Sequence, residues 1–394
     1  MQPIAITGSS VFSPLGTDPD GFWQGLCHPA DLQTPWPLRD LAPYPVNNVI
    51  AVPEETWGTL SNMDGKARSE RVTSFLVRSA LEAAKLNRDG VGTIGCALGT
   101  TTRSAEFCEA EFLEEDGSND VAETPRSDLV PRGNLDWSGP TFTLSTACSS
   151  GLLAPALSAQ IVASGECDFM IAGGVDVLLE YTICGFNSLR VASRDRCRPF
   201  SEERKGVILS EGGACFCLET VDRAEARKAD IQAVILGYGT SCDGGSPTAP
   251  DVEGIARAIK AALGSANLQP DDIAAIIAHG TGTPTNDKVE VEALRRAFAT
   301  TELPPITSVK GAIGHAQGGA GALALFTALS SLKHGKLPGV ANLETVDPAL
   351  APITVSRETL DLSSGCLMVN AFGFGGNNCV MIVASHDYLK RRRH

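Results

Sequence analysis

Aromatic residues make up only 6% of this 394-residue chain, and basic residues are fewer than acidic ones. With 32 Lys and Arg against 46 Asp and Glu, the formal net charge is −14. Such a chain is a poor candidate for binding nucleic acid or an anionic membrane over its whole surface. We therefore predict no nucleic-acid partner, and an acidic protein partner would have to bind a local basic patch. The basic tail, residues 390–393, is expected to be solvated.

Paired cysteines are also missing. The 12 cysteines are scattered singly and include no CxxC pair, which argues against both a disulfide framework and a zinc ligand set. The first residues lack the basic and apolar regions of a signal peptide. No apolar run looks long enough to span a membrane. We expect reduced thiols, a cytoplasmic location and no membrane partner.

The order of the predicted elements repeats once along the chain. In each half a strand, a helix and a strand are followed by a strand–turn–helix unit and a closing strand, at Cys215 and again at Val380. This order predicts an α/β protein with duplicated βαβ halves, residues 1–230 and 231–394. We expect two mostly parallel sheets with helices on their faces, and chemistry at the carboxyl ends of the strands. Residues 20–62 and 106–138 would be insertions in the first half.

Cys148 lies where a predicted strand, residues 141–144, turns into a helix that runs to about residue 164. The first N–H groups of a helix are unpaired and carry a partial positive charge, which stabilises a thiolate. We therefore expect a lowered pKa for this thiol and a nucleophile that is present at neutral pH. The alternative is a buried structural cysteine.

Two of the six histidines follow apolar strands in glycine-rich turns. They are His279, within residues 278–287, and His315, within residues 308–319. A structural role is the alternative for either one alone, but a cysteine and two histidines at strand ends of a duplicated frame indicate a catalytic site. A zinc site is disfavoured, because it usually needs a fourth ligand and closer pairing. The remaining histidines are interpreted as surface residues: His28, His334, His386 and His394.

Five motifs carry a family resemblance that covers nearly the whole chain. They are residues 146–151 around Cys148, residues 198–201 with 211–214, residues 279–283, residues 309–315 and residues 370–378. In this order they resemble the β-ketoacyl-acyl-carrier-protein synthases of the thiolase superfamily, in particular the elongating type that uses Cys-His-His. The resemblance implies a thiolase-like fold with a five-layered α-β-α-β-α core. It also implies a free-standing synthase that works as a dimer on substrates held by acyl carrier protein.

The same resemblance implies a reaction. Cys148 would take an acyl group from a carrier-protein thioester, with the backbone N–H groups of Cys148 and Phe374 as the oxyanion hole. His279 and His315 would donate hydrogen bonds to the malonyl thioester carbonyl while CO2 leaves. The resulting enolate would attack the acyl-Cys148 carbonyl. No metal or organic cofactor is implied.

Further residues receive supporting roles from the resemblance. Lys310 would be an active-site lysine that orients His315. Thr281 and Thr283 would contact the phosphopantetheine amides. Phe374, which lies between glycines, would be a mobile gate between the acyl pocket and the malonyl site. The acidic pair Asp287 and Glu290 is expected to support local structure.

The chain departs from the family pattern at three places. Ala324 stands nine residues after His315, where the family usually has a glutamate, so Lys310 would lack its usual charge partner. Pro155 lies inside the helix that follows the nucleophile and would remove one backbone hydrogen bond. Residues 100–102 are all threonine, where the family often has glycines and a bulky apolar floor of the acyl pocket. This difference hints at an unusual or longer chain, such as a polyene or polyketide.

An acidic carrier protein would need basic residues to dock on. The residues that match the family's docking region are Lys66, Arg68, Arg71, Arg204 and Lys205. The alternative for each is an ordinary solvated charge.

Two other functions stay open. One is a non-decarboxylating thiolase or priming synthase, which is disfavoured because His279 and His315 are both present. The other is a catalytically silent partner subunit of the chain-length-factor kind, against which the presence of Cys148 argues. The partner in the predicted dimer is therefore either an identical chain or such a homologue.

Overall fold

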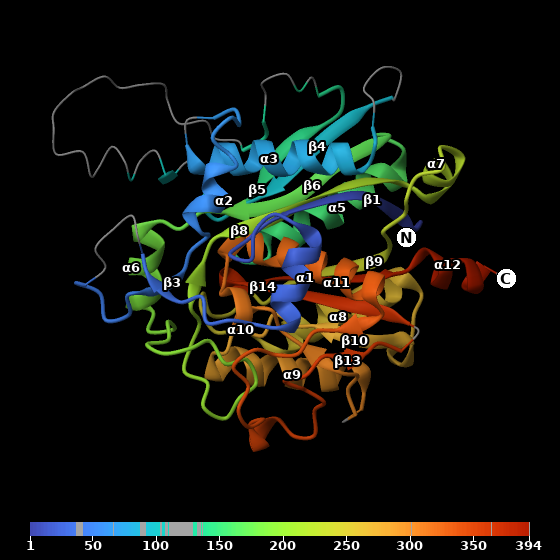
Figure 1. Cartoon of the computed structure of the whole chain (residues 1–394). Coiled ribbons are helices and arrows are strands. Elements are labelled where there is room, and N and C mark those ends of the chain that lie inside the picture. The colour runs from blue at the N-terminus through green and yellow to red at the C-terminus, as the bar shows by residue number, and fades with distance from the viewer. Residues whose placement is uncertain are drawn as a thin grey trace.

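A ten-stranded sheet organises the protein in this computed structural model. The residues that the structure describes are 1–36, 42–65, 67–86, 92–102, 105–106, 109, 129–131, 135, 137–300, 302–363 and 365–393. The strand order in the sheet is β11-β10-β14-β15-β9-β1-β8-β6-β4-β5. Figure 1 shows the first half of the chain above and the second half below.

The two halves of the sheet have the same topology. The strands of the first half are β1 (Ile4–Phe12), β4 (Ile94–Gly99), β5 (Thr141–Leu144), β6 (Phe169–Asp176) and β8 (Gly212–Thr220). Those of the second half are β9 (Ala233–Cys242), β10 (Ile273–Ile277), β11 (Ile306–Thr307), β14 (Cys366–Gly373) and β15 (Asn377–Ala384). Within each half the spatial order is third, second, fourth, fifth, first. The internal duplication expected from the sequence is therefore present in the fold.

The strand directions differ from the expected pair of mostly parallel sheets. In each half the third, second and fourth strands are parallel, but the fifth runs antiparallel to both of its neighbours. In the second half the reason is local, since only residues 374–376 join β14 to β15, and a turn this short can join only antiparallel strands. Moreover, β1 pairs with β9, as in Ile4 opposite Ile235, so the halves form one continuous sheet.

Five layers result from the placement of the helices. Helices α5 (Ser150–Ser164) and α11 (Ala320–His334) pack against each other and against both halves of the sheet. Helix α3 (Arg68–Ala83) covers the outer face of the first half, and α8 (Val252–Ala266) with α9 (Pro284–Phe298) covers that of the second. The predicted α-β-α-β-α core of a thiolase-like fold is confirmed. The division at residue 230 stays a prediction.

The sequence pattern of each helix matches its layer. The outer helix α8 buries Ile255, Ala258, Ile259 and Ala262 at helical spacing, and Asp251 caps its first turn by accepting from Gly254 N at 2.7 Å. The inner helix α11 is instead buried from Ala320 to Ser331, as a helix between two sheet layers must be.

The inner helix of the first half, α5, contradicts the expectation that no apolar run is long enough to span a membrane. With the turn before it, Ala147–Ser164 is long and apolar enough to cross a membrane, with a mean hydropathy of 1.3, but 61% of that window is buried inside the protein as a core helix.

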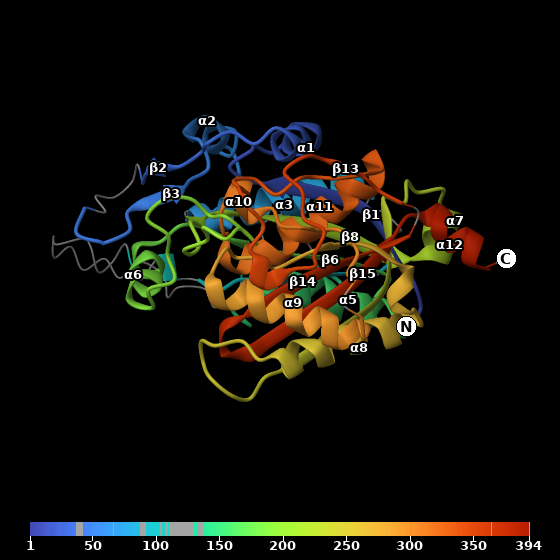
Figure 2. The same ribbon diagram turned by 90° about the horizontal axis from the view of Figure 1, so that it is seen from below.

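The remaining helices and strands are not part of the ten-stranded sheet or of the helix layers that cover it (Figure 2). They are the helices α1 (Pro19–Cys27), α2 (Glu54–Gly58), α6 (Glu180–Ser188), α7 (Val221–Ala226), α10 (Lys310–Ile313) and α12 (His386–Arg393), and the strands β2 (Thr34–Pro35), β3 (Asn48–Ile50), β7 (Leu209–Ser210), β12 (Lys336–Leu337) and β13 (Leu360–Asp361). Both views place α6 on the side opposite the two ends of the chain. The first insertion holds α6 in place, because Tyr44 Oη donates to Glu180 Oε1 at 2.8 Å and Asn187 Nδ2 donates to Val46 O at 3.0 Å.

Glycine at position 174 allows three backbone segments to meet beneath the nucleophile. A Cβ atom at Gly174 would lie 2.4 Å from Gly151 Cα and 2.9 Å from Gly318 O. We predict that Gly174→Ala lowers the free energy of unfolding by about 1–3 kcal/mol, the usual cost of overpacking. The matched control is Gly264→Ala in α8, where a Cβ meets nothing within 4 Å and alanine is expected to be neutral or stabilising. Urea denaturation measures both, and equal midpoints for Gly174→Ala and wild type would contradict the close approach.

Candidate active site

Cys148 lies in a tight turn between β5 and α5. Ala147 has a φ of +51°, and Ser150 Oγ donates to Ala147 O at 2.6 Å. Strand β14 ends directly beside this turn, because a Cβ on Gly373 would lie 2.6 Å from Thr146 O and 3.2 Å from Cys148 N. Glycine is therefore required there, and it brings the backbone of Phe374 next to the thiol.

His315 occupies the equivalent turn of the second half, between β11 and α11. Its backbone pairs with the β7 segment, since His315 N donates to Ile208 O at 2.8 Å and Ser210 N donates to His315 O at 3.1 Å. Its Nδ1 accepts from Gln317 N at 3.2 Å. A neutral imidazole that accepts at Nδ1 carries its proton on Nε2. The ring of His315 therefore presents a donor at Nε2.

His279 follows β10 and is held from two sides. Its backbone N and that of Gly280 donate to the Glu290 carboxylate at 2.9 and 2.8 Å. Lys310 Nζ donates to His279 O and lies 3.5 Å from His279 Nδ1. The expectation that Lys310 orients His315 is corrected here, because its hydrogen-bonding contacts are to His279. An Nδ1 that faces the lysine leaves Nε2 of His279 as the donor.

The two carboxylates that follow this turn serve the backbone. Glu290 also accepts from Asn370 Nδ2 at 3.0 Å, and Asp287 accepts from Phe200 N at 2.9 Å and Gly282 N at 3.2 Å. Both are fully buried, and burial raises their pKa values. This arrangement agrees with the supporting role expected of the acidic pair.

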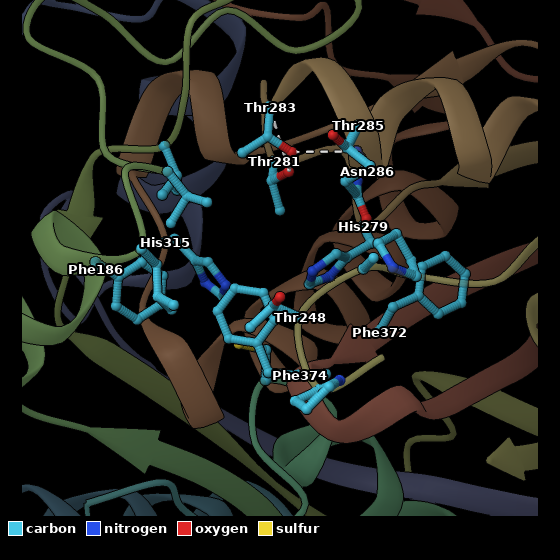
Figure 3. Close-up of a pocket in the computed structure, with 18 of the residues that line it drawn as sticks. Phe186, Thr248, His279, Thr281, Thr283, Thr285, Asn286, His315, Phe372 and Phe374 are labelled. Carbon is cyan, nitrogen blue, oxygen red and sulfur yellow. Dashed lines mark hydrogen bonds between the residues drawn. The ribbon is translucent and has the colours of Figure 1, made fainter. Parts of the chain in front are cut away.

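The three candidate catalytic side chains, Cys148, His279 and His315, line one cavity of about 470 Å³. Figure 3 shows the two imidazoles in this cavity. The imidazoles of His279 and His315 lie edge to face with ring centroids 5.6 Å apart. Thr281 and Thr283 line the same cavity and share a hydrogen bond of 2.9 Å between their hydroxyls. A second cavity of about 240 Å³ also reaches Cys148, and Phe374 lines both. Four distant segments of the chain thus meet at this cavity, and they carry Cys148, His279 with the two threonines, His315 and Phe374.

Burial sets the protonation of the Cys148 thiol, and the lowered pKa expected from the sequence is wrong. Cys148 is 6% exposed, and burial raises the pKa of its thiol to about 12. The positive charge of Lys310 and hydrogen bonds from the backbone N–H groups of Cys148 and Phe374 act in the opposite direction, but they are outweighed. The resting site therefore holds a thiol and not the expected thiolate. The two N–H groups still converge on the sulfur, as an oxyanion hole requires.

Burial also keeps the imidazoles neutral. The pKa values of His279 and His315 lie well below the ordinary value, because burial and then the charge of Lys310 disfavour the imidazolium form. Burial lowers the pKa of Lys310 as well, while the charge of Glu290 opposes this shift. At neutral pH the cavity therefore presents a thiol and two neutral Nε2–H donors. Within the described ranges, no group of three or more His, Cys, Asp or Glu side chains is arranged to hold a metal ion.

The predicted docking residues divide into two kinds. Arg68 pairs with Glu211 at 3.1 Å, and the buried Arg204 pairs with Asp347 at 2.5 Å. Each of these two arginines therefore already forms an ion pair within the chain. Arg71 is half-buried. Lys205 is exposed and lines the larger cavity. Lys66 lies outside the described residues.

Three residues with contacts at the site were not singled out from the sequence. Phe186 lines both cavities, with its ring 6.2 Å from that of His315 and 5.9 Å from that of Phe374. Arg190 is exposed at the larger cavity. Asp176 ends β6 and accepts hydrogen bonds around the smaller cavity. Only Asp176 had a sequence signal, a carboxylate two residues after the glycine pair that follows an apolar run; nothing local marks the other two.

Comparisons with known proteins agree with this fold. The family description "Beta-ketoacyl synthase, N-terminal domain" matches residues 1–224, and "Beta-ketoacyl synthase, C-terminal domain" matches residues 232–344. A 3-oxoacyl-[acyl-carrier-protein] synthase 2 of Staphylococcus aureus is 31% identical over 405 residues, which cover 96% of this chain and 97% of the relative.

Solved structures of the same class superpose over nearly the full length. The ishigamide ketosynthase/chain length factor has a TM-score of 0.87 at 28% identity and covers 98% of this chain and 99% of its own. A β-ketoacyl synthase from Burkholderia phymatum STM815 has a TM-score of 0.86 at 28% identity, with coverages of 98% and 100%. Fold and comparisons together define an enzyme of the acyltransferase class, a ketosynthase. The chain belongs to the β-ketoacyl synthase family.

The raised pKa of Cys148 predicts how its reactivity depends on pH. Below the pKa the thiolate fraction rises about tenfold with each pH unit. We expect the rate at which iodoacetamide alkylates Cys148 to keep rising up to about pH 10, since the pKa lies near 12. Peptide mass mapping separates this residue from the exposed Cys184 and Cys242, which are internal controls. A plateau in the Cys148 rate around neutral pH would show that the site holds a thiolate after all.

Proposed function

We propose that this chain is an elongating, decarboxylating 3-oxoacyl-[acyl-carrier-protein] synthase, acting in fatty acid, polyene or polyketide chain elongation. The observation that carries the proposal is the convergence of one thiol and two neutral imidazole donors, from Cys148, His279 and His315, on a single cavity. Relatives named for this reaction support the substrate class, since the Staphylococcus aureus protein carries the acyl-carrier-protein in its name.

The first half-reaction is the loading of Cys148. The sulfur attacks the thioester carbonyl of an acyl-carrier protein, and negative charge develops on the carbonyl oxygen. The backbone N–H groups of Cys148 and Phe374 stabilise that oxygen. The C–S bond to the carrier then breaks, and the carrier thiol leaves with the proton that the Cys148 thiol gives up. Because the resting thiol is protonated, this proton moves during the transfer and not before it.

The second half-reaction forms the new C–C bond. Malonyl-carrier protein places its thioester carbonyl against the Nε2–H donors of His279 and His315. Loss of CO2 leaves an electron pair that becomes an enolate, whose oxygen those two donors stabilise. The enolate carbon attacks the acyl-Cys148 carbonyl and expels the sulfur, which takes a proton from solvent. The product is a 3-oxoacyl-carrier protein, and decarboxylation drives the reaction without a metal or organic cofactor.

Neighbouring residues assist this sequence. Lys310 supports His279 through its carbonyl and Nδ1, which keeps the Nε2–H of that ring directed into the cavity. Thr281 and Thr283 line the route that a phosphopantetheine arm would follow and have hydroxyls for its amides. Phe374 is the gate between the two cavities. The glycines after it have φ values of +80° and +76°, which suits a hinge.

A dimer is part of the proposal. Strand β5 stands at the end of the sheet, with Thr141 exposed and Phe142 and Leu144 half-buried. Among the described residues no further strand pairs with β5, and an edge strand with apolar side chains is a template for pairing with a second subunit. The partner is a second copy of this chain or a homologous subunit. The name of one related structure, the ishigamide ketosynthase/chain length factor, describes a pair with a homologous subunit.

Intact-mass spectrometry tests the reaction. Wild type and Cys148→Ala are mixed with acyl-carrier protein, and malonyl-carrier protein is then added. We expect an acyl adduct on wild type alone, which is discharged as 3-oxoacyl product in the second step. A folded wild type that takes no acyl group, alone or with a candidate partner subunit, would favour the silent-subunit alternative. An adduct that never condenses would refute the roles of His279 and His315.

The docking of the carrier is predicted to depend on Arg190 and Lys205. Both are exposed at the mouth of the larger cavity, and no ion pair involves either one among the described residues. We expect Arg190→Glu with Lys205→Glu to lower kcat/KM for acyl-carrier protein by about tenfold, mainly through slower association. The loss should shrink as salt is raised.

Two controls separate docking from catalysis. An acyl-pantetheine thioester, which lacks the protein, should react equally with wild type and the double variant. Lys260→Glu, an exposed charge reversal on α8 away from both cavities, should leave kcat/KM for the carrier unchanged. An equal loss with the small thioester would place the two residues in catalysis and refute docking.

A further inference from the structure

Asp176, the last residue of β6, accepts hydrogen bonds from both halves of the fold and is 1% exposed. Its partners in the first half are hydroxyls of the turn after β4, which donate at 2.5, 2.6 and 2.8 Å from Thr100, Thr101 and Thr102. Its partner in the second half is the Gly318 N–H, at 2.6 Å. Neither half-reaction uses this buried carboxylate, although so many donors fix its position.

The segment that Asp176 holds in the second half also holds the ring of His315. The Gln317 N–H donates to His315 Nδ1 at 3.2 Å, which leaves the proton of that ring on Nε2. Gly318 is the next residue, and its N–H is the one that Asp176 accepts. Two successive N–H groups of this segment are thus fixed, one by the imidazole and the other by the carboxylate.

The backbone of Gln317 does not favour this arrangement by itself. Its φ of +50° lies in the left-handed region that non-glycine residues rarely occupy, and such a conformation persists only where the surroundings enforce it. Within the turn, Gly319 N donates to Ala316 O at 2.8 Å, but this local bond sets only the shape of the turn. The bond from Gly318 to Asp176 fixes the turn to the first half of the fold.

Glycine at position 318 allows the carboxylate to come this close. A Cβ atom there would lie 2.7 Å from Asp176 Oδ2 and 2.8 Å from Thr101 N, both inside normal contact distance. The three threonines after β4 have a matching purpose in this arrangement, because their hydroxyls supply the donors that hold the carboxylate in place.

We propose that Asp176 is a positioning residue for the second half-reaction. It holds the segment at Gly318 so that the Gln317 N–H keeps His315 oriented as an Nε2–H donor to the malonyl thioester. The inference rests on the proposed function and adds to it a residue that acts through His315 without touching the substrate.

The loading of Cys148 does not depend on this link. Ser150 holds the turn of Cys148, since its hydroxyl accepts from Thr146 N at 2.8 Å and donates to Ala147 O at 2.6 Å. Burial raises the pKa of the Cys148 thiol to about 12, and the charge of Asp176 adds to this effect. Removal of Asp176 is therefore expected to leave loading unchanged or faster, whereas general damage to the fold would slow both half-reactions.

Single-turnover intact-mass measurements separate the two steps. Hexanoyl-pantetheine loads Cys148, and malonyl-pantetheine then discharges the acyl-enzyme. We expect Asp176→Ala to slow the discharge by about 10–100-fold, the cost of a misplaced reacting group, without slowing the loading. Asp176→Asn keeps an acceptor oxygen for the Gly318 N–H, and its amide N–H can donate to the threonine hydroxyls, so it should restore most of the discharge rate.

Gly318→Ala breaks the same bond from the other side and keeps the test valid if Asp176→Ala does not fold. Its Cβ would displace the carboxylate, and the φ of Gly318 is not in the left-handed region, so alanine adds no backbone strain there. We expect the same selective loss of discharge.

Nitrogen NMR of protein that contains isotopically labelled histidine measures the tautomer directly. His315→Phe assigns the signals by difference. We expect His315 to carry its proton on Nε2 in wild type and to lose this single tautomer in Asp176→Ala.

The matched control is Glu219→Ala, which removes another fully buried carboxylate of the first half, one that pairs with Arg227 away from both cavities. It should leave the ratio of the loading and discharge rates unchanged.

The outcomes separate the two proposals. A wild type that is never loaded, or is loaded and never discharged, refutes the proposed function. If wild type completes both steps, any result for Asp176→Ala other than a selective slowing of discharge overturns the inference alone. A wild-type His315 that carries its proton on Nδ1 overturns it as well.

Discussion

The burial of one thiol and two imidazoles is the constraint on which this site depends. Burial disfavours any charged form, so it raises the pKa of Cys148 and lowers those of His279 and His315. The three groups therefore rest neutral, and the charges of the proposed reaction appear only during it. In a low-dielectric cavity a fixed N–H donor stabilises such a developing charge far better than water-exposed donors do. The same burial that makes the thiol a poor nucleophile at rest thus makes the donors effective.

The duplicated fold explains how these groups come together. Cys148 and His315 occupy equivalent turns of the two halves, each directly before an inner-layer helix, α5 or α11. Because those two helices pack against each other between the halves of the sheet, the turns that precede them meet as well. Strands β10 and β14 end at the same place and supply His279 and the backbone of Phe374. Glycine at positions 174 and 373 lets the segments approach to backbone contact.

The features that could be predicted from the sequence are those that depend on local patterns of residues. The order of strands and helices, the five layers and the positions of Cys148, His279 and His315 at strand ends follow from apolar spacing, glycine-rich turns and the family motifs. The pKa of the thiol could not be predicted in this way, because it depends on burial by segments remote in the chain. The ion pairs of two predicted docking arginines could not be predicted for the same reason, since the partners lie 143 residues away, Glu211 for Arg68 and Asp347 for Arg204. The docking role of both arginines stays a prediction. A pattern of local charges does not show which basic side chains form ion pairs with distant carboxylates.

Ala324, which stands where the family usually has a glutamate, illustrates the same limit of local patterns. The structure also shows how the charge of Lys310 is balanced without that glutamate. The absence of a glutamate there implied that Lys310 would lack a charge partner. In the structure, Glu290 is the carboxylate whose charge most opposes the lowering of the Lys310 pKa by burial. Glu290 also accepts the N–H groups of His279 and Gly280, while Lys310 donates to the carbonyl of His279. One acidic and one basic side chain therefore hold the His279 turn from opposite sides, so the charge balance of Lys310 and the position of the imidazole are set by the same pair of residues. Since neither residue depends on position 324, alanine can stand there without leaving the buried lysine uncompensated.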